Sequence, residues 1–319
     1  MVQPVYFIGM TIQTFDNVKT LITHARCPDG TASALIVQDA LRRKLDIKFM
    51  QYTTPEHINL PATPGMLFVD FSPPRERLQE FVDAGALCLD HHKSQRDIIE
   101  AFGPEHSIYG DEANDPGVSG AVLAWQHIWQ RHHPEANVSD SYYRQWVGTF
   151  ARLIGVRDTW QKASSDWDVA CATASALMFF PSPEDAIALG LPNLCEGWNT
   201  RYGWAGAVTY DKHQARAKYM AEHAYRWTSP SGTKLALFQG ATMASDATEH
   251  VPDADLVVGF DVQYEGNIVK YIYSCRSRKD FDCASFAKKH GGGGHVKAAG
   301  FSWAHPACDP YMLFTKLLP

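Results

Sequence analysis

Three segments of the chain place carboxylates or imidazoles directly after short apolar runs. The tripeptide Asp90-His91-His92 follows one run, Asp70 follows a second, and His24 follows a third. Carboxylate oxygens and neutral imidazole nitrogens are ligands for divalent ions such as Mn²⁺, Mg²⁺, Fe²⁺ and Zn²⁺. A single aspartate at a strand end is usually a turn or helix-cap residue, so only the three segments together indicate a metal. Their coincidence predicts a metal site.

Two further aspartates could complete this site. Asp29 precedes Gly30 at the start of a predicted helix, and Asp158 ends another predicted helix. Two divalent ions about 3.5–4 Å apart can hold a hydroxide and stabilise both oxygens of an in-line phosphoryl displacement. The residue types therefore favour metal-assisted phosphoryl chemistry.

The elements that must position these residues alternate in type along the first half of the chain. Short, uniformly apolar strands are expected at 21–23, 66–69 and 86–89, with helices at 30–44, 75–84, 118–131 and 142–157. Such alternation predicts an α/β fold with a parallel sheet covered by helices on both faces. Ligands in such sheets lie at the carboxyl ends of the strands, where the candidate residues would meet.

The second half has a different character. The stretch 181–210 is rich in Pro, Gly, Asn and Trp and shows no period, and a polar connector helix is expected at 211–227. Strands at 235–238, 256–260 and 268–274 and a helix at 284–290 follow. We therefore expect a catalytic domain at 1–190, a linker at 191–230 and a smaller α/β domain at 231–319, with an active-site cleft between the two domains.

A second group of candidate residues lies in this smaller domain. Arg276-Ser277-Arg278 precedes the glycine run 291–294 and His295. An arginine can hold a phosphate with two hydrogen bonds, and glycines let the backbone approach a ligand closely. Gly292, Gly293, Gly294 and His295 are therefore predicted to bind substrate together with the Arg-Ser-Arg segment. The alternative, a flexible linker, would be longer and richer in serine.

Composition narrows the functional classes. The formal net charge of −6 argues against a broad electrostatic grip on long nucleic acid, but it permits a small anionic substrate in a local basic pocket. Seven scattered cysteines are typical of reduced thiols in a cytoplasmic protein. The sequence lacks a signal-peptide pattern and an apolar run of the roughly 18–20 residues that a membrane span needs. We expect no membrane partner.

These motifs resemble those of the DHH phosphoesterases that carry a DHH-associated C-terminal domain. The match covers most of the chain in order: His24 with Asp29-Gly30, then Asp70, then Asp90-His91-His92, then Asp158, and finally Arg276–Arg278 with the glycine run. The resemblance implies a bilobed protein with a di-manganese site. Mg²⁺, Fe²⁺ or Zn²⁺ are the alternative ions.

The resemblance also implies a role for each residue. Asp70 would bridge two ions, His24 would bind one of them, and Asp29, His91 and Asp158 would bind the other. Asp90 would be a ligand or would orient one, and His92 would contact the scissile phosphate. Arg276 and the loop 291–295 would hold the nucleotide end of the substrate.

One position departs from the family pattern. Two residues before Asp29-Gly30, where the family usually has an aspartate, this chain has Cys27 followed by Pro28. A thiolate prefers Zn²⁺ or Fe²⁺ to Mn²⁺, so Cys27 is an additional candidate ligand. We expect one ion to bind tightly and the other loosely.

The leading hypothesis is a metal-dependent phosphodiesterase that hydrolyses short nucleotides. Candidate substrates are linear dinucleotides, very short RNA, cyclic dinucleotides and 3′-phosphoadenosine 5′-phosphate. The alternatives are a single-strand exonuclease of the RecJ type, an inorganic pyrophosphatase and a degenerate site that only senses a dinucleotide. The partner is expected to be a short nucleotide and not a long duplex, and a homodimer is the candidate assembly.

Overall fold

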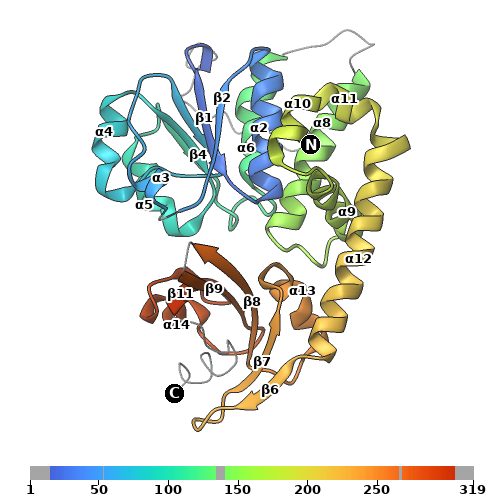
Figure 1. Cartoon of the computed structure of the whole chain (residues 1–319). Helices are drawn as coiled ribbons and strands as arrows, with labels where there is room; N and C mark the ends of the chain where they lie inside the picture. Colours follow the sequence, from blue (N-terminus) through green and yellow to red (C-terminus); the bar gives the residue numbers. More distant parts are fainter. Residues whose placement is uncertain (1–14, 53, 134–140, 266–267, 306–319) are drawn as a thin grey trace. The chain divides into compact units, whose positions relative to one another are not determined.

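The computed structural model describes residues 15–52, 54–133, 141–265 and 268–305, and the chain divides into two compact units (Figure 1). Unit 1 comprises residues 1–210 and unit 2 comprises residues 211–319. Helix α12 (Gly203–Glu222) runs through the point of division. The segment 191–230, predicted as a linker that includes a connector helix, contains several helices and a strand.

Unit 1 is built on a five-stranded sheet in the order β2-β1-β3-β4-β5, with every neighbouring pair parallel. This confirms the predicted parallel α/β fold. The chain fills the sheet outward from β1 in both directions, so the strand order reverses between β1 and β3, a point where ligands commonly bind. The strands are β1 (Thr20–His24), β2 (Asp46–Met50), β3 (Met66–Val69), β4 (Leu87–Asp90) and β5 (Ser107–Tyr109).

Both faces of this sheet are buried. In β3, Leu67 and Val69 face one apolar cluster, which α2 (Pro28–Leu41), α6 (Gly120–Ala124) and α8 (Ser141–Asp158) complete. Met66 and Phe68 face a second cluster, formed with α4 (Leu78–Asp83) and α5 (Arg96–Ala101). Alternate residues of a strand point to opposite faces, so two buried faces explain why these strands are uniformly apolar.

The remaining helices of unit 1 show where the sequence-based expectations were wrong. The stretch 181–210, which shows no period in its sequence, forms helices α10 (Pro183–Leu189) and α11 (Leu191–Glu196), a π-helical turn (Trp198–Tyr202) and the start of α12. Pro183 and Pro192 lie in the first turns of their helices, where proline stabilises a helix instead of breaking it. The unit also contains α3 (Pro55–Ile58), α7 (Gln130–His132) and α9 (Trp167–Met178).

The helix predicted over 118–131 is divided into three parts. It comprises α6, a π-helical turn (Trp125–Trp129) and α7. Ser119 is the N-cap of α6, and its hydroxyl accepts a hydrogen bond from the backbone N–H of Val122. Trp129 is buried, and its indole N–H donates to Asp39 of α2, so this tryptophan packs in the core.

Unit 2 contains a six-stranded mixed sheet in the order β10-β11-β9-β8-β7-β6. The pair β7 and β8 is parallel and the other pairs are antiparallel. The connector helix predicted to reach residue 227 ends at Glu222, and Trp227 lies in a strand instead. The elements are β6 (Tyr225–Thr228), β7 (Lys234–Gln239), α13 (Ala244–Ala247), β8 (Leu256–Glu265), β9 (Ile268–Arg276), α14 (Cys283–Lys289), β10 (Gly293–His295) and β11 (Ala298–His305).

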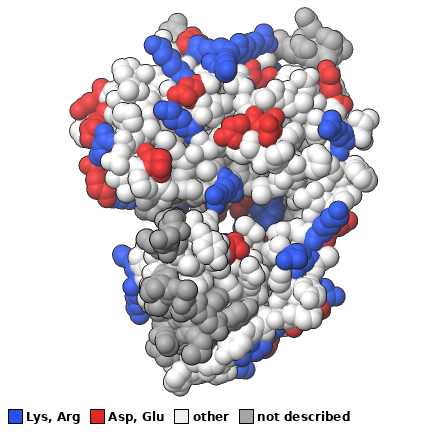
Figure 2. Space-filling view, viewed as in Figure 1, with Lys and Arg blue, Asp and Glu red and all other residues white. Residues whose placement is uncertain are grey.

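Both positively and negatively charged side chains lie on the face of the molecule that Figure 2 shows. Basic side chains gather along the upper edge of unit 1, and acidic and basic side chains are mixed elsewhere on this face. Among the described residues, no helix has the length and apolar character needed to cross a bilayer.

Candidate metal centre

The candidate ligands of unit 1 meet at the carboxyl edge of its sheet. His24 ends β1, Asp70 directly follows β3, and Asp90 ends β4. Three groups of side chains each bring their ligand atoms within 4.8 Å of one another. These groups are His24, Cys27 and Asp70; Asp29, His91 and Asp158; and Asp70, Asp90, His91 and His92.

His91 lies at the centre of the cluster. Its Nε2 atom is 3.3 Å from Asp70 Oδ1, 3.4 Å from Asp158 Oδ2 and 3.7 Å from Asp29 Oδ2. The other ring nitrogen, Nδ1, is 3.5 Å from Glu112 Oε1. A carboxylate beside the distal nitrogen of a histidine orients the ring and leaves the near nitrogen for a metal.

Asp29 is fixed by the N-terminus of α6. Its Oδ1 atom accepts hydrogen bonds from the Ser119 hydroxyl (2.7 Å) and the Ala121 N–H (2.9 Å), and its Oδ2 atom accepts one from the Gly120 N–H (2.7 Å). A Cβ atom at Gly120 would lie 2.3 Å from Asp70 Cβ and 3.0 Å from Asp29 Oδ2. Only glycine fits here.

The backbone at Asp70 is left-handed, with φ at 57°. Few residues other than glycine adopt this conformation, although aspartate tolerates it better than most. Such strain is concentrated at functional sites, where the surrounding structure holds it in place. Here the turn directs the carboxylate of a buried residue toward His91.

A second hydrogen-bonded network holds His92. Its Nδ1 atom is 2.6 Å from Asp90 Oδ1, which also accepts bonds from the backbone N–H groups of His91 and His92. The other oxygen of Asp90 accepts a 2.7 Å bond from the Ser72 hydroxyl and lies 3.4 Å from the Tyr52 hydroxyl. Asp90 therefore acts here as the group that orients His92.

Sequence reasoning missed several of these supporting residues, namely Tyr52, Ser72, Glu112, Ser119 and Gly120. One signal was available. Ser119 directly precedes a predicted helix, which is the pattern of an N-cap. Nothing in the sequence could show that the same hydroxyl reaches a carboxylate 90 residues away. The other four residues lie in loops or at an element end and show no periodicity.

The carboxylates of the cluster repel one another. Burial and the neighbouring Asp29 raise the pKa of Asp70 well above its usual value, and the same two causes raise the pKa of Asp158 to about 6. Burial, reinforced by His92, lowers the pKa of His24 to about 4, so its imidazole is neutral and has a lone pair to donate. The raised pKa values of the two carboxyls describe buried acids with too little positive charge nearby, whereas burial favours the neutral form of the His24 imidazole.

The pair of His92 and Asp90 behaves differently. Burial opposes the charge on His92, but the adjacent Asp90 carboxylate outweighs it and raises the pKa of His92 to about 9. Burial likewise opposes ionisation of Asp90, but His92 keeps the pKa of this carboxyl below its usual value. At neutral pH His92 can therefore donate a proton or a hydrogen bond to an anionic group.

The donor atoms fit a divalent ion. His24 Nδ1 and Asp70 Oδ2 are buried and have no hydrogen-bond partner among the described residues. Unpaired buried polar atoms are rare in proteins and require an explanation. Oxygen and nitrogen donors in this number suit Mn²⁺, Mg²⁺, Fe²⁺ or Zn²⁺.

Arg276, at the end of β9 in unit 2, is the candidate anion-binding residue. Its Nε atom donates to the Ser245 hydroxyl (2.7 Å), and its Nη1 atom donates to the carbonyls of Cys275 and Ala299. All three partners are neutral, and the described residues form no ion pair with it. Burial lowers the pKa of Arg276 from its usual high value. A half-buried cation whose hydrogen-bond partners are neutral can accept an anionic ligand.

The neighbouring candidates of unit 2 differ in their surroundings. Ser277 is buried, whereas Arg278 is exposed and forms an ion pair with Glu249. The glycine run has a packing role, because a Cβ atom at Gly292 or Gly294 would collide with β11. A Cβ atom at Gly293 would meet nothing within 4 Å. The backbone of His295 lies in β10, and its side chain is outside the described part of the structure.

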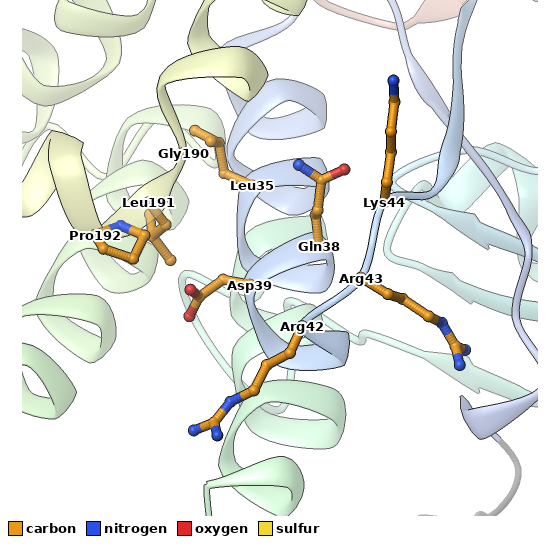
Figure 3. Close-up of a pocket in the computed structure, with 9 residues that line it drawn as sticks. All are labelled: Leu35, Gln38, Asp39, Arg42, Arg43, Lys44, Gly190, Leu191 and Pro192. Carbon is orange, nitrogen blue, oxygen red and sulfur yellow. The ribbon is translucent and has the colours of Figure 1, made fainter.

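A separate cavity lies beside the C-terminal half of α2 (Figure 3). It has a volume of about 410 Å³, and Asp39, Arg42 and Lys44 line it on one side and Gly190–Pro192 on the other. Arg43 points away from 190–192 and donates to the carbonyls of Phe15 and Val18. Thirteen residues of helix, about 20 Å, separate Arg42 from Asp29, so this cavity is not part of the metal centre.

Comparisons with known proteins rest on structure alone. No family model and no curated protein sequence matches the chain. The pGpG-specific phosphodiesterase PggH from Vibrio cholerae has 15% identity and a TM-score of 0.52, and the match covers 94% of this chain and 98% of that chain. The DHH domain of a member of a family of ribosomal proteins has 12% identity and a TM-score of 0.55, with 95% and 86% covered.

The fold is the DHH fold. The first two matches support this assignment, because each covers nearly the whole of both chains. RecJ from Thermus thermophilus in complex with Mg²⁺ also resembles the chain, with 16% identity, a TM-score of 0.48 and a match to 51% of that chain. The shared DHH fold confirms the resemblance inferred from the motifs, and Asp90, His91 and His92 are the residues of the motif that gives the fold its name.

Proposed function

We propose that this protein is a metal-dependent phosphodiesterase that hydrolyses short nucleotides. The observation that carries the proposal is the buried Asp and His cluster at the sheet edge of a DHH fold, together with a charged His92 held by Asp90. Bound at this cluster, divalent ions would supply an activated water and would stabilise charge on the phosphoryl group.

The residues of unit 1 then have distinct tasks. His24, Cys27 and Asp70 would hold one ion, and Asp29, His91 and Asp158 would hold the other. His92 binds a phosphoryl oxygen or donates a proton to the leaving oxygen, and Asp90 keeps its ring in place. Ser72 and Tyr52 in turn keep Asp90 in place.

Unit 2 would recognise the nucleotide. The Arg276 guanidinium can donate two parallel hydrogen bonds to a phosphate. The open position at Gly293 gives a ligand room to approach the backbone closely. We assign Ser277, Arg278, Gly292, Gly294 and His295 supporting roles around this anion site.

A short substrate is favoured over a long strand. The net charge is negative, and a long strand would need a continuous basic channel. The structurally similar PggH is specific for pGpG, so a linear dinucleotide is the first substrate to test. Free thiols at all the described cysteines agree with the cytoplasmic location that we propose. The homodimer stays a prediction.

The test is product analysis with purified protein and Mn²⁺. The substrates are pGpG, cyclic di-GMP, 3′-phosphoadenosine 5′-phosphate and a long single strand, and ion-pair chromatography separates the products. His92→Asn is the matched variant, because it removes the protonated imidazole while leaving both three-residue ligand groups intact. We expect mononucleotide release from short substrates, and a rate at least about a hundredfold lower in the variant.

Other outcomes would favour the alternatives. Stepwise mononucleotide release from the long strand, at a rate similar to that from pGpG, would indicate an exonuclease. Tight binding of a dinucleotide in calorimetry, with no product at saturating Mn²⁺, would indicate a sensor. Equal rates for the wild type and His92→Asn would contradict the assigned role of His92.

A further inference from the structure

Cys27 occupies a position that the fold controls closely. It is the N-cap of α2, with Pro28 in the first turn after it. The Cys27 carbonyl accepts hydrogen bonds from both the backbone N–H and the hydroxyl of Thr31. Two hydrogen bonds from Thr31 therefore hold the Cys27 carbonyl at the start of α2.

Common structural roles do not account for a cysteine here. N-cap positions favour Ser, Thr, Asp and Asn, whose oxygens accept a helix N–H, but Cys27 makes no cap hydrogen bond through its side chain. It is a free thiol, so it has no disulfide role. Its sulfur lies among carboxylates and imidazoles and not within one of the apolar clusters.

The side chains around the sulfur contain atoms that could bind a cation and that have no hydrogen-bond partner among the described residues. One ligand atom each from His24, Cys27 and Asp70 lies within 4.8 Å of the other two. His24 Nδ1 and Asp70 Oδ2 are buried without a partner among the described residues, and Asp70 is only 1% exposed. Two orphaned polar atoms beside a thiol suggest a ligand set of nitrogen, sulfur and oxygen.

The second group of ligands is different in kind. Asp29, His91 and Asp158 offer two carboxylates and one imidazole, with no sulfur. Hard oxygen donors suit Mn²⁺ and Mg²⁺, whereas thiolates select Zn²⁺ and Fe²⁺. The two candidate metal positions therefore differ in the softness of their ligand atoms.

We propose that the metal centre is mixed, with a thiophilic ion, Zn²⁺ or Fe²⁺, bound by His24, Cys27 and Asp70, and Mn²⁺ or Mg²⁺ bound by Asp29, His91 and Asp158. Binding at the first position breaks the S–H bond of Cys27, forms a metal–sulfur bond and releases the proton to solvent. The inference rests on the metal centre of the proposed function, but it does not depend on hydrolysis.

Cobalt substitution tests the sulfur ligand directly. Metal-free protein is titrated with Co²⁺, and the near-ultraviolet absorption of sulfur-to-cobalt charge transfer is recorded. We expect a band that saturates at one Co²⁺ per chain and is absent in Cys27→Ser and Cys27→Asp. Cys88→Ala is the control because Cys88, in β4, is a buried thiol of the same unit, and it should retain the band.

Ion selectivity gives a second readout. The protein is loaded from an equal mixture of Zn²⁺ and Mn²⁺, and the ions per chain are counted by mass spectrometry, with electron paramagnetic resonance for Mn²⁺. We expect one ion of each kind in the wild type and two Mn²⁺ in Cys27→Asp, which offers a carboxylate in place of the thiolate. A loaded wild type with two Mn²⁺ and no sulfur band would overturn the proposal, as would a band that persists without Cys27. No substrate is involved, so an inactive protein can still pass this test.

Discussion

The Asp29 carboxylate accepts a 2.7 Å hydrogen bond from the hydroxyl of Ser119, which lies 90 residues away in the sequence. This bond ties the first turn of α2 to the first turn of α6. Because Asp29 is also a candidate ligand, the same contact supports both the packing of two helices and the geometry of the metal centre.

Replacing Ser119 should therefore have two effects. Ser119→Ala removes the bond to Asp29 and the cap of α6, so we expect the free energy of unfolding to fall by about 1–2 kcal/mol. We also expect about tenfold weaker ion binding, because groups that orient ligands have effects of this size. Urea denaturation and calorimetry with Mn²⁺ measure the two quantities.

Ser182→Ala is the matched control. Ser182 caps α10 through a capping box but contacts no candidate ligand, so its loss should affect stability alone. Unchanged ion affinity in Ser119→Ala would mean that Asp29 does not depend on this cap for its position.

Glu112 should influence ion binding without belonging to the cluster. Its carboxylate is 3.5 Å from His91 Nδ1, and its side chain is 53% exposed. We expect Glu112→Gln to weaken Mn²⁺ binding by about tenfold, because the His91 ring loses a charged acceptor that favours donation by Nε2. Glu105→Gln, at an exposed position nearby in sequence, should bind Mn²⁺ like the wild type, and equal affinities for both variants would count against this assignment.

The two arginines of unit 2 should differ in their effect on substrate binding. Arg276 has only neutral partners, whereas Arg278 pairs with Glu249 at the surface. We expect Arg276→Lys, which keeps the charge but loses the bidentate geometry, to raise the Kd for a dinucleotide by about tenfold. Arg278→Lys should raise the Kd less than Arg276→Lys does, because Arg278 has only a supporting role, and calorimetry on the ion-loaded protein measures both. A larger effect at Arg278 would reverse the assignment.

His127 predicts a pH dependence of stability away from the metal centre. Burial, reinforced by Arg131, lowers the pKa of His127 to about 4. The unfolded chain then binds more protons than the folded chain between about pH 4 and the usual histidine pKa of about 6.5, so stability falls as the pH falls through this window. The contribution lost between about pH 7 and about pH 5 is about 2 kcal/mol.

His127→Gln isolates this contribution because glutamine does not titrate. We expect the loss of stability on acidification to be smaller in the variant by that amount. The comparison uses urea denaturation of metal-free wild type and variant, since the carboxylates of the centre titrate equally in both. An identical loss in the two proteins would show that His127 is protonated without cost in the folded state.

Much of unit 1 could be predicted from the sequence because its elements are locally determined. The strand Met66–Val69 has the predicted bounds, since a strand buried on both faces must be uniformly apolar. The meeting of His24, Asp70 and Asp90 follows from the parallel sheet, which brings its strand ends to one edge. Asp29 and Asp158 reach the cluster from helices α2 and α8. The position of a motif at a strand end can be predicted once the strand and the type of sheet are known, without knowledge of side-chain packing.

Other features depend on packing that the sequence does not display. The strand Asp46–Met50 was missed because it mixes charged and apolar residues at the edge of the sheet. The strand β11 begins at Ala298, just after the glycine run, and was not predicted from the sequence. Gly292 and Gly294 owe their identity in part to this strand, which leaves no room for a Cβ atom.

Every residue of the candidate metal centre lies between His24 and Asp158, within unit 1. During synthesis these residues leave the ribosome before Arg276 is translated, and domains generally fold as units from the N-terminus. A nascent chain can therefore capture its ions before the part that would recognise a nucleotide exists. The order of translation thus allows metal loading to precede any contact with substrate.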